Sequence, residues 1–137
     1  MEFFGVRARV LADGEATGGH LGLVDLIDAP PGDMPPLHVH HTHDEGFYPR
    51  AGALTVYLPG REVRVGVGEF FLAPRGIPHT YRVWDEGPAT WLVTSTPAGF
   101  ERFVAHIGSL DRHDEAEMTA IAATYGIEIL GPPGAMP

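Results

Sequence analysis

The sequence predicts an all-β fold, a sandwich or barrel of short strands, followed by one or two C-terminal helices. The 137 residues include 18 Gly and 13 Pro, and 44% of them are apolar. This composition is typical of many short strands joined by turns. Short apolar runs separated by turn residues fill roughly the first two-thirds of the chain, and a helical spacing of apolar residues begins only near residue 97. The length suits a single domain, expected over residues 1–130.

The strands are predicted from alternation and from the turns between them. Residues 4–10 alternate apolar and other side chains, which is the period of a half-buried strand. A second apolar run covers residues 21–27 and ends at a Pro-Pro-Gly turn. Further strands are predicted wherever apolar runs are bounded by Pro and Gly, at residues 53–58, 62–67, 69–73, 80–84 and 90–96.

Two helices are predicted near the C-terminus. The first covers about residues 97–107, with Pro97 as its first residue and apolar side chains that recur at helical spacing, namely Phe100, Phe103, Val104 and Ile107. The second covers about residues 115–125, because Asp114 and Glu117 form a capping-box pattern and Gly126 is a typical helix stop. Residues 131–137 are expected to form a loose tail.

Composition and charge exclude several classes of function. The formal net charge is −9, and all nine basic residues are Arg. The chain lacks Lys and Cys, so it can build no Schiff base, thiolate nucleophile, zinc–thiolate site or disulfide. The negative charge argues against binding to nucleic acid or to an anionic membrane surface. No long apolar run or signal-like start is present, so a cytoplasmic protein is expected.

A cluster of histidines precedes a glutamate. His38 and His40 are two residues apart, so in a strand they share one face. Glu45 can join them only if residues 41–44 turn and Glu45 opens the next strand. His79 follows a rigid segment with two prolines and opens another predicted strand. Three imidazoles and one carboxylate from different strands would hold a divalent transition metal well, whether Mn, Fe, Ni, Cu, Co or Zn.

Other histidines carry less information. His43 could compete with Glu45 and is kept as a reserve ligand; the alternative is that His41 and His43 are only solvated surface residues. His20, His106 and His113 are isolated, and each is expected to be structural or exposed. A buried glutamate without a cation would be costly, which favours a metal site if the barrel prediction is right.

The spacing of these residues resembles the cupin superfamily. Its first motif, G(x)5HxH(x)4E(x)6G, is matched over residues 32–52 by Gly32, His38, His40, Glu45 and Gly52. Its second motif, G(x)5PxG(x)2H(x)3N, is matched over residues 68–83 by Gly68, Pro74, Gly76 and His79, with Val83 in place of the final Asn. The resemblance implies a double-stranded β-helix, or jelly-roll barrel, with His38, His40, Glu45 and His79 as metal ligands.

A closer likeness is to small single-domain bacterial cupins described as quercetin-dioxygenase-like. It is carried by the segments at residues 35–41, 97–101 and 125–128. The likeness implies a homodimer and a quercetinase-like oxidoreductase or a polyketide cyclase. One departure is Pro49, which follows Phe47-Tyr48 in a strand position. Because Pro cannot donate to a sheet, that strand must be at an edge, bulged or broken there.

Three functions follow from this reading. The first is a metal-dependent dioxygenase acting on a phenolic or enol aromatic substrate, with Glu45 as both ligand and proton acceptor. The second is a non-redox cyclase or isomerase that uses the same metal, and the third is a non-catalytic small-molecule-binding barrel. Alternation places Phe47, Tyr81 and Val83 inside the barrel with Trp91, where they would form an apolar, aromatic substrate pocket.

Overall fold

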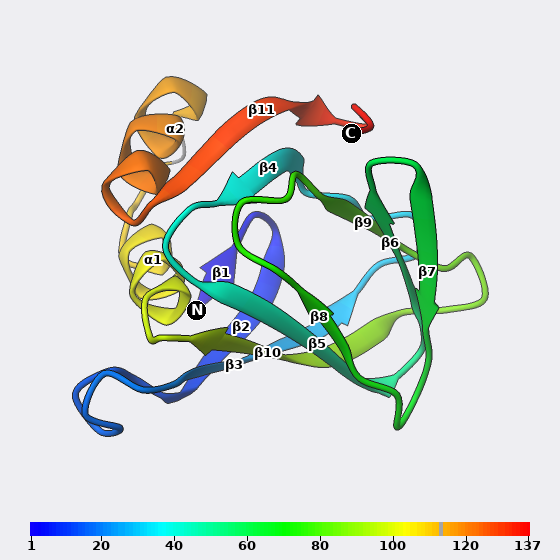
Figure 1. The fold of residues 1–137 in the computed structure, drawn as a ribbon, viewed down its shortest axis with the longest axis horizontal. Coiled ribbons are helices and arrows are strands. Elements are labelled where there is room, and N and C mark those ends of the chain that lie inside the picture. Colours follow the sequence, from blue (N-terminus) through cyan, green and yellow to red (C-terminus); the bar gives the residue numbers. More distant parts are fainter. Residues whose placement is uncertain (113) are drawn as a thin grey trace.

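The computed structural model describes all residues except 113. The elements in these residues follow one another along the chain as β1 (Glu2–Phe3), β2 (Val6–Ala12), β3 (Gly22–Ala29), β4 (Pro36–His40), β5 (Asp44–Ala51), β6 (Leu54–Leu58), β7 (Arg61–Val65), β8 (Phe71–Ala73), β9 (Thr80–Val83), β10 (Ala89–Thr96), α1 (Phe100–Gly108), α2 (Glu115–Thr124) and β11 (Ile127–Pro133). The two helices lie at one end of the sheets, as Figure 1 shows. The mostly β fold with two C-terminal helices is the class that the sequence predicts.

The strands form a barrel from three antiparallel groups. The largest group has the order β1-β2-β3-β10-β5-β8, and it faces a three-stranded group, β7-β6-β9, and a two-stranded group, β11-β4. Segments far apart in the sequence therefore become neighbours: β10 lies between β3 and β5, and β11 pairs with β4. This winding brings the first and second histidine-bearing segments to the same interior.

Alternation explains which side chains fill the barrel. In β2, Val6 and Ala8 are buried, whereas Arg7 and Arg9 between them are exposed. In β10, every second residue is buried, including Trp91. At the helical end, Phe3 packs edge-to-face against Phe100 and Phe103 of α1, with ring centroids 5.7 and 5.4 Å apart. The helix therefore closes this end of the barrel with an aromatic cluster.

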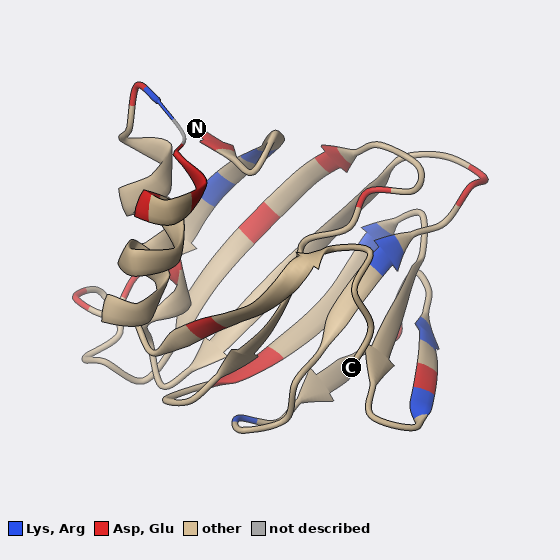
Figure 2. Ribbon diagram, turned by 90° about the horizontal axis from the view of Figure 1, so that it is seen from above, with Lys and Arg blue, Asp and Glu red and all other residues tan. Residues whose placement is uncertain are grey.

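The arginines of β2, β5 and β7 lie on different parts of the ribbon, with acidic positions between them (Figure 2). The expectation that the chain binds no nucleic acid stays a prediction. In the part of the chain that the structure describes, neither helix has the length and apolar character needed to cross a membrane.

The predicted helix starts need one correction. α1 begins at Phe100 rather than Pro97. Residues 97–99 form a turn instead, in which the Ser95 hydroxyl donates to the carbonyl of Pro97 at 2.8 Å and accepts from the Phe100 amide at 3.2 Å. α2 starts where the sequence predicts, because the Asp114 carboxylate accepts from the amide of Glu117 at 3.0 Å.

Both predicted chain ends also differ from the structure. Phe4 lies in a turn with a positive φ of 50°, so the strand expected from residue 4 begins at Val6. The tail expected to be loose from Gly131 instead continues β11 as far as Pro133, which pairs with Pro36. β11 pairs only with β4, and an edge strand with one paired side tolerates prolines.

The strand containing Pro49 is bulged near that residue, which is one of the three predicted alternatives. β8 pairs with β5 only through residues 45–47, so Pro49 has no strand neighbour on that side. On the other side, the register between β10 and β5 shifts between Thr90 and Trp91, opposite Pro49. The irregularity therefore begins beyond Phe47, and the ladder around Glu45 is regular.

Candidate metal centre

Three chain segments bring the predicted ligands together. His38 and His40 lie on β4, Glu45 lies near the start of β5, and His79 immediately precedes β9. The backbones of His38 and His79 exchange two hydrogen bonds, with N–O distances of 3.2 and 2.9 Å. The amide of Gly76 also donates to the carbonyl of His40 at 2.8 Å. These bonds fix the second motif against the first, and residues 41–42 bend so that Glu45 enters β5, as expected.

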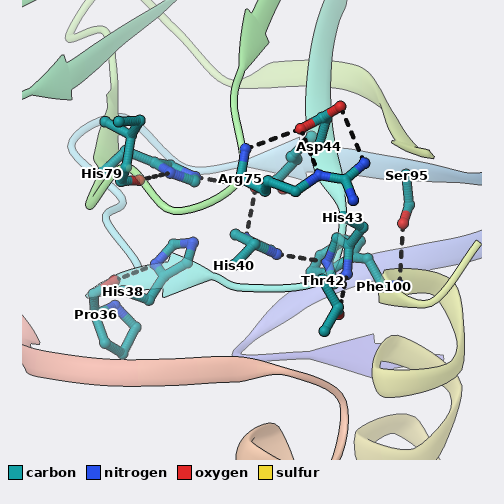
Figure 3. Close-up of polar contacts among 12 residues, drawn as sticks. Pro36, His38, His40, Thr42, His43, Asp44, Arg75, His79, Ser95 and Phe100 are labelled. Atoms are coloured by element: carbon teal, nitrogen blue, oxygen red, sulfur yellow. Dashed lines mark hydrogen bonds and ion pairs between the residues drawn. The ribbon is translucent and has the colours of Figure 1, made fainter. Parts of the chain in front are cut away.

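The four side chains form one buried cluster. Their ligand atoms all lie within 4.8 Å of one another, and each side chain is buried in the barrel interior. The Glu45 Oε2 atom is 2.8 Å from His40 Nε2 and 3.0 Å from His79 Nε2. Figure 3 shows the imidazoles of His38, His40 and His79 directed toward a common space.

The Nδ1 atoms of the three imidazoles each have a hydrogen-bonding partner outside the cluster. His38 Nδ1 donates to the carbonyl of Pro36 at 2.6 Å, and His79 Nδ1 lies 3.4 Å from the carbonyl of Ile77. His40 Nδ1 lies 2.6 Å from His43 Nε2. Binding a cation at Nε2 requires the proton of each ring on Nδ1, so that Nε2 offers a lone pair to the interior. Without a cation, His79 Nε2 can instead donate to Glu45 Oε2, 3.0 Å away. His40 Nε2 is close to Glu45 but makes no aligned hydrogen bond.

This arrangement fits a divalent cation. Three inward lone pairs beside a carboxylate repel one another unless a positive charge lies between them. A set of three imidazoles and one carboxylate is suited to transition metals of the Mn-to-Zn series. The fit therefore rests on the donor set and its ring orientations, and the cluster is consistent with the metal site that the sequence predicts.

The electrostatics of the cluster favour a neutral His38 beside an ionised Glu45. Burial, together with neighbouring His79 and His40, lowers the pKa of His38 to about 3. Burial alone would raise the pKa of Glu45, but charge and hydrogen bonds from His40 and His79 hold it well below its usual range. His38 is therefore ready to bind a cation without first losing a proton, and Glu45 is an anion.

An ion pair fixes the start of β5 beside the cluster. Asp44 Oδ1 accepts from the amide of Arg75 at 2.9 Å and from its Nε at 3.1 Å. Arg75 Nη2 also donates to the carbonyl of Thr96 at 3.2 Å. These hydrogen bonds lower the pKa of Asp44. Arg75 thus connects the second motif to β5 and β10, one residue away from Glu45.

Two cavities adjoin the cluster. An inner chamber of about 40 Å³ is lined by His38, His40 and Glu45 together with aromatic side chains that include Tyr81 and Trp91. An outer cavity of about 860 Å³ lies between the N-terminal strands, α2 and β11. Their shared wall contains Phe3, Phe4, Leu26, Pro35, Pro36, Tyr81 and Ile129. Among the residues that the structure describes, the ionisable ones in the outer wall are Asp33, Tyr81 and Glu115, and no Arg lines it.

Two of the four predicted pocket residues line a cavity, and the other two do not. Tyr81 and Trp91 line the inner chamber, and their ring centroids are 5.3 Å apart. Phe47 and Val83 point inward but are fully buried and line neither cavity. Phe47 instead packs against Tyr81 and His79, with ring centroids 5.8 and 6.1 Å away. It supports the chamber from behind through these contacts with Tyr81 and His79.

The remaining histidines lie outside the cluster. His43 contacts His40 on the nitrogen that faces away from Glu45, so its position does not match that of a reserve ligand. His41 is exposed and pairs with Glu128, and His20 and His106 are exposed. His113 lies outside the described residues. Sequence reasoning missed the wall residues from β1, α1 and β11, because apolar residues far from the motifs carry no chemical signal of a site.

Comparison with known proteins agrees with this geometry. The model of the cupin domain family matches residues 25–95, which include both histidine motifs up to β10. The chain therefore belongs to the cupin family, as its motif spacing indicates.

Individual relatives extend the comparison. The chain is 36% identical over 112 residues to a quercetin 2,3-dioxygenase of Bacillus subtilis (strain 168), covering 80% of this chain but only 32% of that protein. It thus spans about a third of this curated relative. KdgF from Halomonas sp. superposes with a TM-score of 0.63 at 22% identity, covering 74% of this chain and 89% of that one. The polyketide cyclase RemF from Streptomyces resistomycificus gives 0.56 at 27% identity, covering 66% and 64%.

Proposed function

We propose that this cupin binds one divalent transition metal through His38, His40, Glu45 and His79 and acts as a metal-dependent dioxygenase on a phenolic or enol aromatic substrate. The observation that carries the proposal is the buried cluster of three histidines and one glutamate beside an aromatic-walled cavity. The likeness to a quercetin 2,3-dioxygenase supports the reaction class.

The cavities support an uncharged aromatic substrate. The outer cavity, about 860 Å³, lies in the size range of ordinary ligand pockets, roughly 300–1,000 Å³. Its described wall is mostly apolar and aromatic and carries carboxylates but no Arg, so it disfavours an anionic substrate. The inner chamber, about 40 Å³, holds one or two small molecules at most. A ring is therefore expected in the outer cavity with its reactive edge directed toward the cluster.

Each polar side chain of the chamber has a defined role in this proposal. When bound, the metal supplies Lewis acidity that stabilises a developing oxyanion. Glu45 is ionised, so it can accept the proton of a substrate hydroxyl. Burial, then the charges of Asp33 and Glu45, raise the pKa of Tyr81 well above its usual value. Tyr81 therefore keeps its hydroxyl proton and can donate a hydrogen bond to a substrate oxygen at the wall between the cavities.

A second candidate is a non-redox cyclase or isomerase. It is favoured by the likeness to a polyketide cyclase structure at 27% identity, and it needs the same cluster with a redox-inert ion such as zinc. A non-catalytic binding barrel would instead leave its ligand unchanged.

One experiment separates these functions. The metal content of the purified protein is measured beside that of a His79→Ala variant, and oxygen uptake is then followed with flavonols under saturating metal. A dioxygenase consumes oxygen with flavonol loss, and the variant does neither. Product formation without oxygen uptake would instead support the cyclase or isomerase, and unchanged ligand after long incubation would support the binding barrel.

A further inference from the structure

We propose that His43 is a positioning residue that fixes the orientation and tautomer of His40. It accepts a hydrogen bond from the Nδ1–H group of His40 and so directs the Nε2 lone pair of His40 into the cluster. The inference rests on the proposed metal site, but it concerns metal affinity and not the reaction that follows.

The contact is short and enclosed. His43 lies in the connection between β4 and β5, three residues after His40, and its side chain is 1% exposed. Its Nε2 is 2.6 Å from His40 Nδ1, and the two ring centroids are 4.6 Å apart at an interplanar angle of 74°. Figure 3 shows the contact between the two rings, with Thr42 next to His43. No water is needed to complete this bond.

The tautomers along this chain of contacts follow from the donors and acceptors. His40 must carry its proton on Nδ1 if Nε2 is to face the cluster as a lone pair. His43 must then accept at Nε2, so its own proton is on Nδ1, which lies 3.3 Å from the Thr42 hydroxyl oxygen.

His40 differs from the other two imidazole ligands in the kind of partner that its Nδ1 atom has. The Nδ1 atoms of His38 and His79 face the backbone carbonyls of Pro36 and Ile77, which no side-chain substitution removes. The partner of His40 is a side chain. The orientation of one ligand out of three can therefore be altered without touching a ligand or the backbone.

The expected consequence is a change in metal affinity. Hydrogen-bonding partners of metal-bound histidines typically contribute about 10–100-fold to affinity, because they fix the ring and raise its basicity. We expect this range for loss of His43. Because the ligands themselves remain, the number of ions bound per chain at saturation should not change.

The test uses two substitutions at His43 and a matched control. His43→Phe keeps a ring of similar volume but has no acceptor, whereas His43→Gln keeps a side-chain carbonyl that can accept from His40. His41→Ala removes the adjacent histidine, which is exposed and contacts only Glu128 among the described polar side chains. Dissociation constants for Co²⁺ and Zn²⁺ are measured by chelator competition, together with the visible spectrum of the Co²⁺ form and the thermal unfolding of each metal-free variant.

The proposal predicts about 10–100-fold weaker Co²⁺ and Zn²⁺ binding and a shifted Co²⁺ spectrum for His43→Phe. His43→Gln should recover part of both, and His41→Ala should match the parent protein. Unchanged affinity and spectrum in His43→Phe would overturn the positioning role. So would weakening in His43→Gln as large as in His43→Phe, since an acceptor would then not matter.

The outcomes also distinguish this inference from the proposed function. A parent protein that binds Co²⁺ but consumes no oxygen with any flavonol contradicts the dioxygenase proposal and leaves the role of His43 standing. A parent protein that binds neither Co²⁺ nor Zn²⁺ contradicts both. A His43→Phe variant that loses a whole equivalent of bound metal would make His43 a direct ligand and overturn the positioning role.

Discussion

Two glutamates are buried in this acidic chain, and they are neutralised in different ways. Glu45 on β5 is 4% exposed and Glu101 on α1 is 1% exposed. Glu101 accepts from the backbone amides of Gly14 and Gly99, at 2.9 and 2.5 Å. Glu45 faces the Nε2 atoms of His40 and His79. One carboxylate is surrounded by backbone donors, and the other by side chains whose lone pairs can bind a cation.

The comparison teaches that burial alone does not identify a functional carboxylate. Backbone N–H groups are permanent donors, so they satisfy Glu101 without any further ligand. Glu101 thereby connects the loop around Gly14, the turn at residues 97–99 and α1. Gly22 lies so close to Glu101 that a side chain there would collide with the carboxylate. The imidazoles around Glu45 leave its charge dependent on a proton or a metal ion, which is what a binding site requires.

The largest expected effect separates the two glutamates by metal content. Glu45→Gln removes the anionic ligand, and we expect metal affinity to fall by more than about 100-fold, a larger loss than that of a hydrogen-bonding partner. Glu101→Gln should keep the full metal content of the parent protein. Elemental analysis after dialysis against a weak chelator measures both. Equal metal loss in the two variants would contradict the distinction.

The second-largest expected effect is a difference in stability between substitutions at Glu101 and at Glu45. In metal-free protein, Glu101→Ala should lower the free energy of unfolding by about 3–5 kcal/mol, because it leaves a buried amide N–H of Gly14 and a part-buried one of Gly99 without acceptors. Glu45→Ala should cost less, since a neutral imidazole can move its proton to Nδ1 when Glu45 is lost, whereas a backbone amide keeps its proton. Urea unfolding in the presence of a chelator gives both values. A smaller loss for Glu101→Ala than for Glu45→Ala would reverse the comparison.

The difference also explains what the sequence could and could not predict. Spacing located His38, His40, Glu45 and His79, because metal ligation needs particular side chains and alternation gives their faces. Glu101 carried no comparable signal, since its partners are backbone amides far away in the chain. For the same reason, the sequence showed only that His43 was near the ligands, while its contact with the outer nitrogen of His40 depends on the bend at residues 41–42.

The ends of the strands and helices were the other feature that the sequence did not predict. Alternation predicted the strands of the barrel, but it could not show that β11 continues through two prolines, because the tolerance depends on which side of the strand is paired. Likewise, Pro97 is a typical first helical residue, and only the tertiary contacts of Ser95 and Glu101 place the start of α1 at Phe100. The outer cavity depends on these same segments, so its wall could not be predicted either.

The third effect is a pH dependence that belongs to the cluster around Glu45. The pKa of His38 in the folded protein is about 3, below the ordinary value of 6.5, so the unfolded chain takes up a proton first. The contribution of neutral His38 to the free energy of unfolding is therefore fully present above about pH 6.5 and is lost as the pH falls toward 3. Between pH 7.5 and 5, this amounts to about 2 kcal/mol in metal-free protein. The lowered pKa of Glu45 acts in the same direction at lower pH.

Urea unfolding of metal-free protein at pH 7.5 and pH 5 measures this loss. A His38→Phe variant has no proton to gain at this position, so its stability should change less over the same interval, whatever its absolute value. If the parent protein is equally stable at both pH values, or if His38→Phe loses as much as the parent, the neutral buried imidazole is not the cause.

The smallest effect tests whether Glu101 needs a cation at all. Arg102 Nε lies 4.0 Å from Glu101 Oε2, but the arginine side chain is 62% exposed. An exposed ion pair at this distance contributes at most about 1 kcal/mol, and salt screens it. We therefore expect Arg102→Ala to change the free energy of unfolding by less than about 1 kcal/mol, measured by urea unfolding at low and high salt. A loss approaching that of Glu101→Ala would mean that a positive charge, and not the amides of Gly14 and Gly99, balances this carboxylate. The two glutamates would then follow the same rule, and the type of partner would no longer mark Glu45 as the functional one.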